Sequence, residues 1–443
     1  MRSLLRRSLS LSLGLATLPA LACIGCSGSG SSSSGTQGTI VAATVTRDLH
    51  PTVASGSASA LVSGNTDFAL GLYHGLSSGS TTDNLFFSPY SVSLALAMTY
   101  AGAQGSTASQ MATALSFTLP DAQLNPAFDQ LDLAIEANPT TAKGANGQPF
   151  ALKLANSLWG DEKVTFGQPF VNTLAADYGA SLRTVDFVNQ STQAEAAINA
   201  WVASETNNLI DPLLGPGAVG PSTELVLVNT VYFNAAWASQ FQPSETSNGA
   251  FTRADGSAVQ TPLMSSASVA STYTKGSNYE AVELPYSGGT TSMVIVLPDA
   301  GAYADVEKGL SGSFFATVSS ALQPQGEIDL TMPKFKIAGA AVSLVTPLEA
   351  LGMTDAFNPK KANFDGMIPA GGSFISDIIH KAFVDVDESG TEAAAATAVI
   401  VGGASVAETP VIVNVNRTFF FFIRDVSTGT VLFVGRENDP TTT

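Results

Sequence analysis

The segment from residue 391 to residue 401 most constrains what this chain can fold into, because its side chains suit insertion into a sheet. It follows an expected strand at Phe383–Val386 and an expected turn at Asp387–Gly390. The single charge of the segment, Glu392, lies on one face of the strand that the segment would form. The other face carries only small or β-branched uncharged side chains, at Thr391, Ala393, Ala395, Thr397, Val399 and Val401. Such a segment can join a sheet as an added strand without burying a charge.

The four consecutive alanines, Ala393–Ala396, leave other interpretations open. Alanine has the highest intrinsic helix propensity, so the same residues fit an ordinary helix with an alanine face. They also fit a flexible surface linker, because no bulky aromatic or basic side chain occurs between Thr391 and Ala407. Taken alone, the segment does not distinguish these structures from an inserted strand.

The charge of the chain excludes some classes of partner. With 19 basic and 36 acidic residues among 443, the formal net charge is −17. A chain this acidic has no general attraction for phosphate backbones, so we expect no nucleic-acid partner and no heparin-like cofactor. Three histidines and two cysteines are too few for a His/Cys metal cluster in the folded part. We therefore expect neither a metal nor a cofactor.

The N-terminus has the pattern of an export signal. Arg2, Arg6 and Arg7 precede the mainly apolar stretch Leu9–Leu21, and small residues follow at the expected cleavage boundary. We assign residues 1–25 to this signal. The mature protein is then expected outside the cell, or at the outer membrane as an envelope lipoprotein.

Both cysteines, Cys23 and Cys26, fall at this boundary and admit two interpretations. They are either incidental or part of a bacterial lipoprotein signal, in which one of them carries the lipid that attaches the protein to a membrane. The Ser/Gly-rich stretch that follows is typical of a flexible tether, which we place at residues 26–62. The remainder, residues 63–443, is expected to form one large domain.

Helical and strand patterns are distributed unevenly along this domain. Helices are expected at 66–76, 88–102 and 193–208. Strands dominate the later part of the chain, with expected ranges 223–233, 291–297, 327–337, 417–424 and 430–434. This order indicates an α+β fold with large antiparallel sheets.

Short motifs that follow one another in a fixed order identify the family. They are found at Asn84–Ser91, Gly102–Thr107, Leu227–Phe233, Pro333–Phe335, Leu351–Met353, Phe364–Met367, His380–Phe383, Glu388–Thr397, Phe419–Arg424 and Thr428–Arg436. Over nearly the whole folded part, the chain resembles the serpin family. The resemblance implies three β-sheets, about nine helices and an exposed reactive-centre loop. Thr418 departs from the family pattern, which usually has proline there, and Ser389 replaces a common glutamate.

The resemblance also implies a function, which is inhibition and not catalysis. A serine protease cleaves the reactive loop of a serpin, becomes trapped as an acyl-enzyme and forms a covalent complex with a serpin monomer. The hinge of the loop then inserts into the main sheet. In this chain the resemblance assigns the hinge to Glu388, Gly390, Thr391, Glu392, Ala393, Ala394, Ala395, Ala396 and Thr397.

The position of the cleaved bond follows from counting along the family pattern. The hinge glutamate, Glu388, is usually the seventeenth residue back from this bond, which places it at Ala404–Ser405. Counting back from Asn416 gives a residue near Ala407 instead. Both choices put a small residue before the bond, and no basic residue occurs between Thr391 and Asn416. The expected targets are therefore elastase- or subtilisin-like serine proteases, with a cysteine protease as the alternative.

Further residues match functional positions of the family. Ser88, Ser91, Asn229 and His380 match a polar cluster under the main sheet called the shutter, although a helix cap and a core histidine are the plainer interpretations of Ser88 and His380. Trp237 matches the breach, where insertion begins. A non-inhibitory serpin that binds ligands or assists folding is the alternative function. A hydrolase is disfavoured, because the Gly-x-Ser-x-Gly match at Gly75–Gly79 follows an expected helix where a strand is needed.

Overall fold

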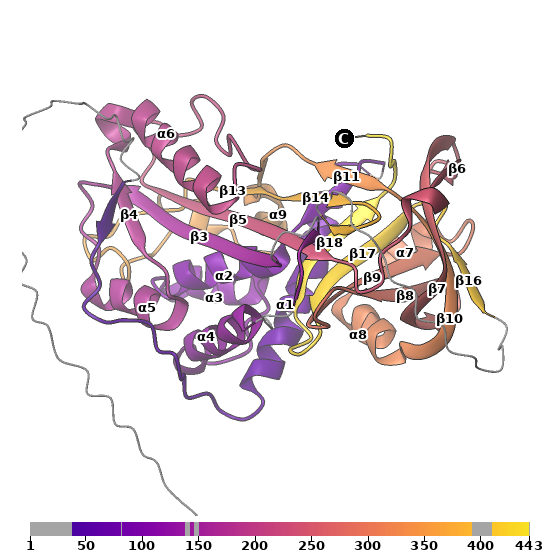
Figure 1. Ribbon diagram of the computed structural model, residues 1–443. Coiled ribbons are helices and arrows are strands. Elements are labelled where there is room, and N and C mark those ends of the chain that lie inside the picture. Colours follow the sequence, from indigo (N-terminus) through magenta and orange to yellow (C-terminus); the bar gives the residue numbers. More distant parts are fainter. Residues whose placement is uncertain (1–37, 81, 138–141, 146–149, 392–409, 443) are drawn as a thin grey trace, which may run out of the picture. The chain divides into compact units, whose positions relative to one another are not determined.

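The computed structural model describes residues 38–80, 82–137, 142–145, 150–391 and 410–442. Two sheets dominate the structure (Figure 1). The first follows the order β1-β4-β3-β5-β15-β14-β11, and β13 pairs with both β5 and β12. Its strands are β1 (Thr39–Val41), β3 (Ala151–Asp161), β4 (Leu182–Val185), β5 (Leu225–Ala236), β11 (Phe335–Ala338), β12 (Val342–Ser343), β13 (Asp377–Lys381), β14 (Phe383–Val386) and β15 (Gly390–Thr391).

The second sheet follows the order β16-β10-β7-β8-β9-β17-β18-β2, with β6 also paired to β7. Its strands are β2 (Leu85–Phe87), β6 (Ser247–Thr252), β7 (Ala258–Lys275), β8 (Tyr279–Pro285), β9 (Thr291–Pro298), β10 (Gln323–Pro333), β16 (Val411–Asn414), β17 (Phe419–Asp425) and β18 (Val431–Glu437). The beginning of β7 pairs with β6 and its end with β8, so one 18-residue strand joins two sheets of the family fold. The three sheets expected from the sequence are confirmed, and two of them are joined through β7 into the second sheet described here.

The described residues form nine α-helices, as the resemblance implies. They are α1 (Ser57–Ser77), α2 (Pro89–Tyr100), α3 (Gly105–Ala114), α4 (Asp121–Glu136), α5 (Gln168–Tyr178), α6 (Phe187–Glu205), α7 (Tyr303–Gly309), α8 (Gly312–Ala321) and α9 (Val345–Ala350). Helix α6 lies on one face of the first sheet, and α2 lies on the opposite face (Figure 1). None of the described helices is long and apolar enough to cross a membrane.

Strand β5 is buried along all of its length, because both faces of the first sheet are covered. Leu225 and Leu227 belong to the main core, whereas Val226 and Val228 pack in a separate core beneath α6. The alternation follows from the period of two of a strand. It explains why this part of the sequence is too apolar for a strand with an exposed face.

The structure corrects the expected strand at 327–337. The chain leaves the second sheet at the end of β10 and enters the first sheet at the start of β11, with Lys334 between them. Polar and apolar side chains alternate in both parts, which is why the sequence alone indicates one strand, but the buried positions shift by one residue at Met332 and Pro333. The transition places Lys334 at the junction of the two sheets.

The structure also corrects the expected tether at residues 26–62. Residues 38–56, which we call the N-terminal strap, pack on the folded domain, and α1 begins at Ser57, before the expected boundary at residue 63. Strand β1 pairs with β4, and the Thr44 amide donates to Asn172 of α5 (2.9 Å). Residues 1–37, which include the expected export signal with Cys23 and Cys26, lie outside the described residues.

An arginine attaches the strap to α4. The guanidinium of Arg47 pairs with Asp129 (2.8 Å), Asp132 (2.7 Å) and Glu136 (3.1 Å). Asp129 and Asp132 are buried. Burial, together with the charge of Glu136, raises the pKa of Asp132 to about 6 although Arg47 opposes the shift. The strap therefore compensates carboxylates that would be costly to bury alone.

Replacing Arg47 by methionine is expected to destabilise the native state by about 2 kcal/mol at pH 8, because two buried carboxylates lose their cation. The loss should shrink at pH 5, where Asp132 binds a proton and no longer needs the charge. The free energy of unfolding, measured by urea titration at each pH, checks this change. Lys361→Met is a matched control, since Lys361 is exposed and lies 3.7 Å from its partner Asp355. A loss independent of pH would contradict the assigned role of Arg47.

Candidate functional site

Two residues of the hinge, Gly390 and Thr391, already lie in the first sheet. Strand β15 enters between β5 and β14, where Gly390 pairs with Ala236 and Thr391 pairs with both Ala235 and Val386. Both neighbouring strands run antiparallel to β15. The other hinge residues, Glu392–Thr397, and the expected reactive bond at Ala404–Ser405 lie outside the described residues.

Further along β5, the same side of the strand is occupied by β13. The two strands are parallel and in register from Asp377–Val226 to Lys381–Thr230. The first sheet is thus separated by β15 at one end and closed by direct β5–β13 pairing at the other. A longer β15 has to replace this pairing.

A glycine is required where the hinge enters the sheet. Gly390 has a φ of 155°, and a Cβ atom on it would lie 2.1 Å from the carbonyl oxygen of Ala235 and 2.7 Å from the Cα of Ala236. Real Cβ atoms do not approach backbone this closely, so any side chain at this position would push β15 away from β5.

Backbone and indole hydrogen bonds hold the turn that precedes β15. Trp237 donates from its amide to the Ser389 carbonyl and from Nε1 to the Asp387 carbonyl, both at 2.9 Å. The Phe241 amide donates to the Glu388 carbonyl at 3.0 Å. Three consecutive residues of the turn are therefore fixed to the segment that follows β5.

The carboxylate of Glu388 binds the junction between the two sheets. It accepts from Lys334 Nζ and from Thr246 Oγ1, each at 2.7 Å. Burial acts to raise the pKa of Glu388, but these two hydrogen bonds hold it below its ordinary value. The carboxylate therefore stays ionised and paired at neutral pH.

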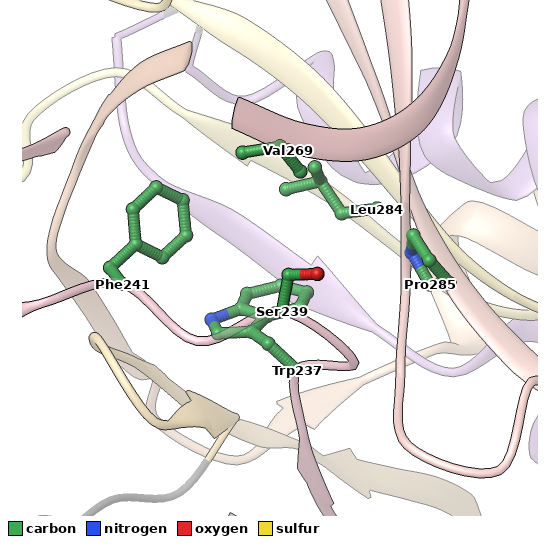
Figure 2. A pocket seen from close by; sticks show the side chains of 6 residues that line it. All are labelled: Trp237, Ser239, Phe241, Val269, Leu284 and Pro285. Atoms are coloured by element: carbon green, nitrogen blue, oxygen red, sulfur yellow. The ribbon is translucent and has the colours of Figure 1, made fainter. Parts of the chain in front are cut away.

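Trp237 also forms an aromatic stack with Tyr286, which in turn contacts the hinge at Thr391. Its ring lies face to face with that of Tyr286, with centroids 4.5 Å apart and planes 8° from parallel. Figure 2 shows the other surroundings of Trp237, where Phe241, Val269 and Leu284 line a cavity of about 10 Å³. This volume suits one water molecule, so the cavity belongs to the packing of the site.

The four residues matched to the shutter lie together under the first sheet. His380 Nδ1 donates to Asn229 Oδ1 (2.7 Å), and His380 Nε2 accepts from the Ser88 amide (3.2 Å). The Asn229 amide group donates to Ser91 Oγ and to Asn156 Oδ1. Ser88 is also the N-cap of α2, since its hydroxyl accepts from the Ser91 amide, so both interpretations of Ser88 hold at once.

The imidazole of His380 is neutral. A backbone amide can only donate, so Nε2 carries no proton while Nδ1 carries one. Burial lowers the pKa of His380 to about 4. The hydrogen bond between β13 and β5 therefore involves no charge at neutral pH.

Comparison with known proteins decides the family. The model of the family described as "Serpin (serine protease inhibitor)" matches residues 63–440. The chain belongs to the serpin family.

Similar serpins include both inhibitors and proteins of other function. Human leukocyte elastase inhibitor is 35% identical over 86% of this chain and 99% of its own. A serpin-like protein of Methanosarcina acetivorans is 33% identical over 86% of both chains. Among solved structures, the thermophilic serpin tengpin in its native state has a TM-score of 0.76 at 30% identity, covering 89% of this chain and 96% of its own. Human thyroxine-binding globulin with thyroxine also has a TM-score of 0.76, at 28% identity, covering 87% and 100%.

Three contributors to the site of this serpin were missed from the sequence. Asn156 joins the shutter cluster, Thr246 binds Glu388, and Tyr286 contacts both Trp237 and the hinge. No local pattern marks these residues, because each contact joins parts of the chain that lie far apart. The family motif Pro333–Phe335 does contain Lys334, but nothing in it names Glu388 as the partner.

The native serpin is expected to lose stability when His380 is protonated. The unfolded state binds a proton near pH 6.5 and the native state only near pH 4, so the contribution of the neutral imidazole is present above pH 6.5 and decreases as the pH falls toward 4. The difference corresponds to about 3 kcal/mol. Urea unfolding of the wild type and of His380→Gln, from pH 7.5 to 4, measures it. Parallel pH profiles for the two proteins would refute the assignment.

Proposed function

We propose that this serpin is an irreversible inhibitor of serine proteases that acts by cleavage of its loop near Ala404–Ser405. The observation that carries the proposal is the position of Thr391 between β5 and β14. From there the hinge has a defined path into the first sheet. The alternating small side chains of the hinge fit this path.

The register of β15 supports this path. Each step along an antiparallel hinge is matched by one step back along β5 and along β14. Thr397 lies as far beyond Thr391 as Asn229 lies before Ala235 and as His380 lies before Val386. Without a bulge, insertion therefore brings Thr397 between Asn229 and His380, which now bind each other. One strand register would therefore connect the entry point at Thr391 with the shutter residues Asn229 and His380.

Insertion also explains the proposed irreversibility. The protease serine attacks the carbonyl carbon of Ala404 and forms an ester, while the amine of Ser405 leaves with the proton it gains. The freed hinge then exchanges the β5–β13 pairing for a strand with partners on both sides. Trapping requires that this step outpace hydrolysis of the ester. The closed sheet is accordingly a kinetically trapped state.

The proposed targets are elastase- or subtilisin-like, because the residue before the bond is small at Ala404 and also at Ala407. The similarity to human leukocyte elastase inhibitor supports the elastase-like class. We further propose that the serpin is exported and acts as a monomer. If Cys26 carries a lipid, the tether to Gly38 has a root-mean-square reach of about 20 Å, which keeps the domain close to the membrane.

The mature protein is expected to form a covalent complex when it is mixed with pancreatic-type elastase or subtilisin, and not with trypsin. Denaturing gels would show a band at the summed mass. Mass spectrometry would identify a released C-terminal peptide beginning at Ser405. Cleavage without a covalent band by all of these proteases would overturn the proposal and favour a non-inhibitory serpin, as thyroxine-binding globulin and maspin are among the similar structures.

Successive hinge residues lie on opposite faces of the expected strand, which provides a matched pair of variants. Ala395→Arg places a charge on the face that enters the core, at a cost of several kcal/mol, so insertion should fail and the serpin should be cleaved as a substrate. Ala394→Arg places the same charge on the face that already carries Glu392, where the neighbouring β14 residues Phe383 and Asp385 are only partly buried, and should leave inhibition near wild type. The stoichiometry of inhibition is expected to rise more than tenfold for the first variant only. Equal effects of both variants would contradict insertion in this register.

A further inference from the structure

A buried hydrogen bond joins the hinge to a strand of the other sheet. The hydroxyls of Tyr286 and Thr391 lie 2.7 Å apart, and both residues are buried. Tyr286 directly follows β8, whereas Thr391 ends the described part of the hinge. This contact is the deepest point of the hinge in the described structure.

Tyr286 is held rigidly from several sides. Its ring stacks on Trp237 and meets Phe233 edge-on, with centroids 5.1 Å apart. Its backbone forms an antiparallel bridge with Trp237, at the point where β5 ends. The phenol therefore has a fixed position at the entrance between β5 and β14.

The phenol of Tyr286 stays protonated at neutral pH, and either hydroxyl can be the donor in its bond with Thr391. Burial raises the pKa of Tyr286 well above its ordinary value, and the Thr391 hydroxyl only partly opposes this shift. Because both residues are buried, a hydroxyl that loses its partner there is shielded from bulk solvent. Releasing Thr391 thus leaves Tyr286 unsatisfied unless the whole site opens.

We propose that Tyr286 is a positioning residue that holds Thr391 in the first sheet before cleavage, so that insertion starts from a strand already begun. This inference rests on the proposed inhibitory function, which it deepens by assigning the residue that sets the starting point. A strand with two residues in place can extend by one pair at a time. A hinge outside the sheet first has to fix several residues before it gains any partner.

The contact has a property that separates it from general packing. Removing one hydroxyl leaves the other buried without a partner, but removing both leaves an apolar pair of nearly the same shape. Tyr286→Phe and Thr391→Val should each release the hinge. The double variant Tyr286→Phe/Thr391→Val should hold it almost as well as the wild type does.

Hydrogen–deuterium exchange of residues 386–391 in the uncleaved protein tests this inference without a protease. Each single variant is expected to exchange about tenfold faster than the wild type in this segment, and the double variant within about twofold of it. Tyr273→Phe is a matched control, because it removes a phenol that binds Glu280 at 3.2 Å on β7 and should leave the hinge segment unchanged. Unchanged exchange in the single variants, or additive acceleration in the double variant, would overturn the inference.

The stoichiometry of inhibition gives the second readout. It should rise for each single variant, since more acyl-enzyme hydrolyses before insertion, and return toward the wild-type value for the double variant. If the variants show the expected exchange pattern but the wild type traps no protease, the proposed function is rejected. The role of Tyr286 in holding the hinge then still stands. If the protease is trapped and the exchange pattern is absent, only the role of Tyr286 is rejected.

Discussion

The structure depends on the fact that β5 does not have the same neighbour along its whole length. At one end it pairs with β15, and at the other it pairs directly with β13. Both pairings satisfy the backbone, and in the proposed mechanism the first grows by replacing the second with a longer strand. The proposed conformational change is thus an exchange of strand partners within one sheet.

The side chains around this sheet have complementary tasks. Near β13, a neutral network of His380, Asn229 and Ser88 keeps the strands together without burying a charge. Near β15, an ion pair between Glu388 and Lys334 lies at the surface end of the entry point, and the uncharged contact of Tyr286 with Thr391 lies inside. Charge is thus confined to the part of the path where water can still reach it.

Local chemistry could be predicted from the sequence, and contacts between distant segments could not. The cap of α2 at Ser88 was predicted because a serine before a proline is typical of a helix start. The end of the tether was predicted wrongly, because Arg47 finds its carboxylates 82 or more residues away. The family resemblance predicted that Ser91, Asn229 and His380 belong to one cluster, and the structure places them in contact. It gave no indication of Asn156 or Tyr286, whose partners are set by the three-dimensional packing of two sheets.

The N-terminal strap has a consequence for association between molecules. An unpaired edge strand offers its amides and carbonyls to any extended chain, and is a common starting point for aggregation. Strand β1 covers three of the four residues of β4, which would otherwise be the outer strand on that side of the first sheet. The proposed insertion of the hinge makes protection of this rim more important, because the sheet would then have to accept a new strand. Because this side of the sheet ends in the three-residue strand β1, the chain offers little edge there for an added strand.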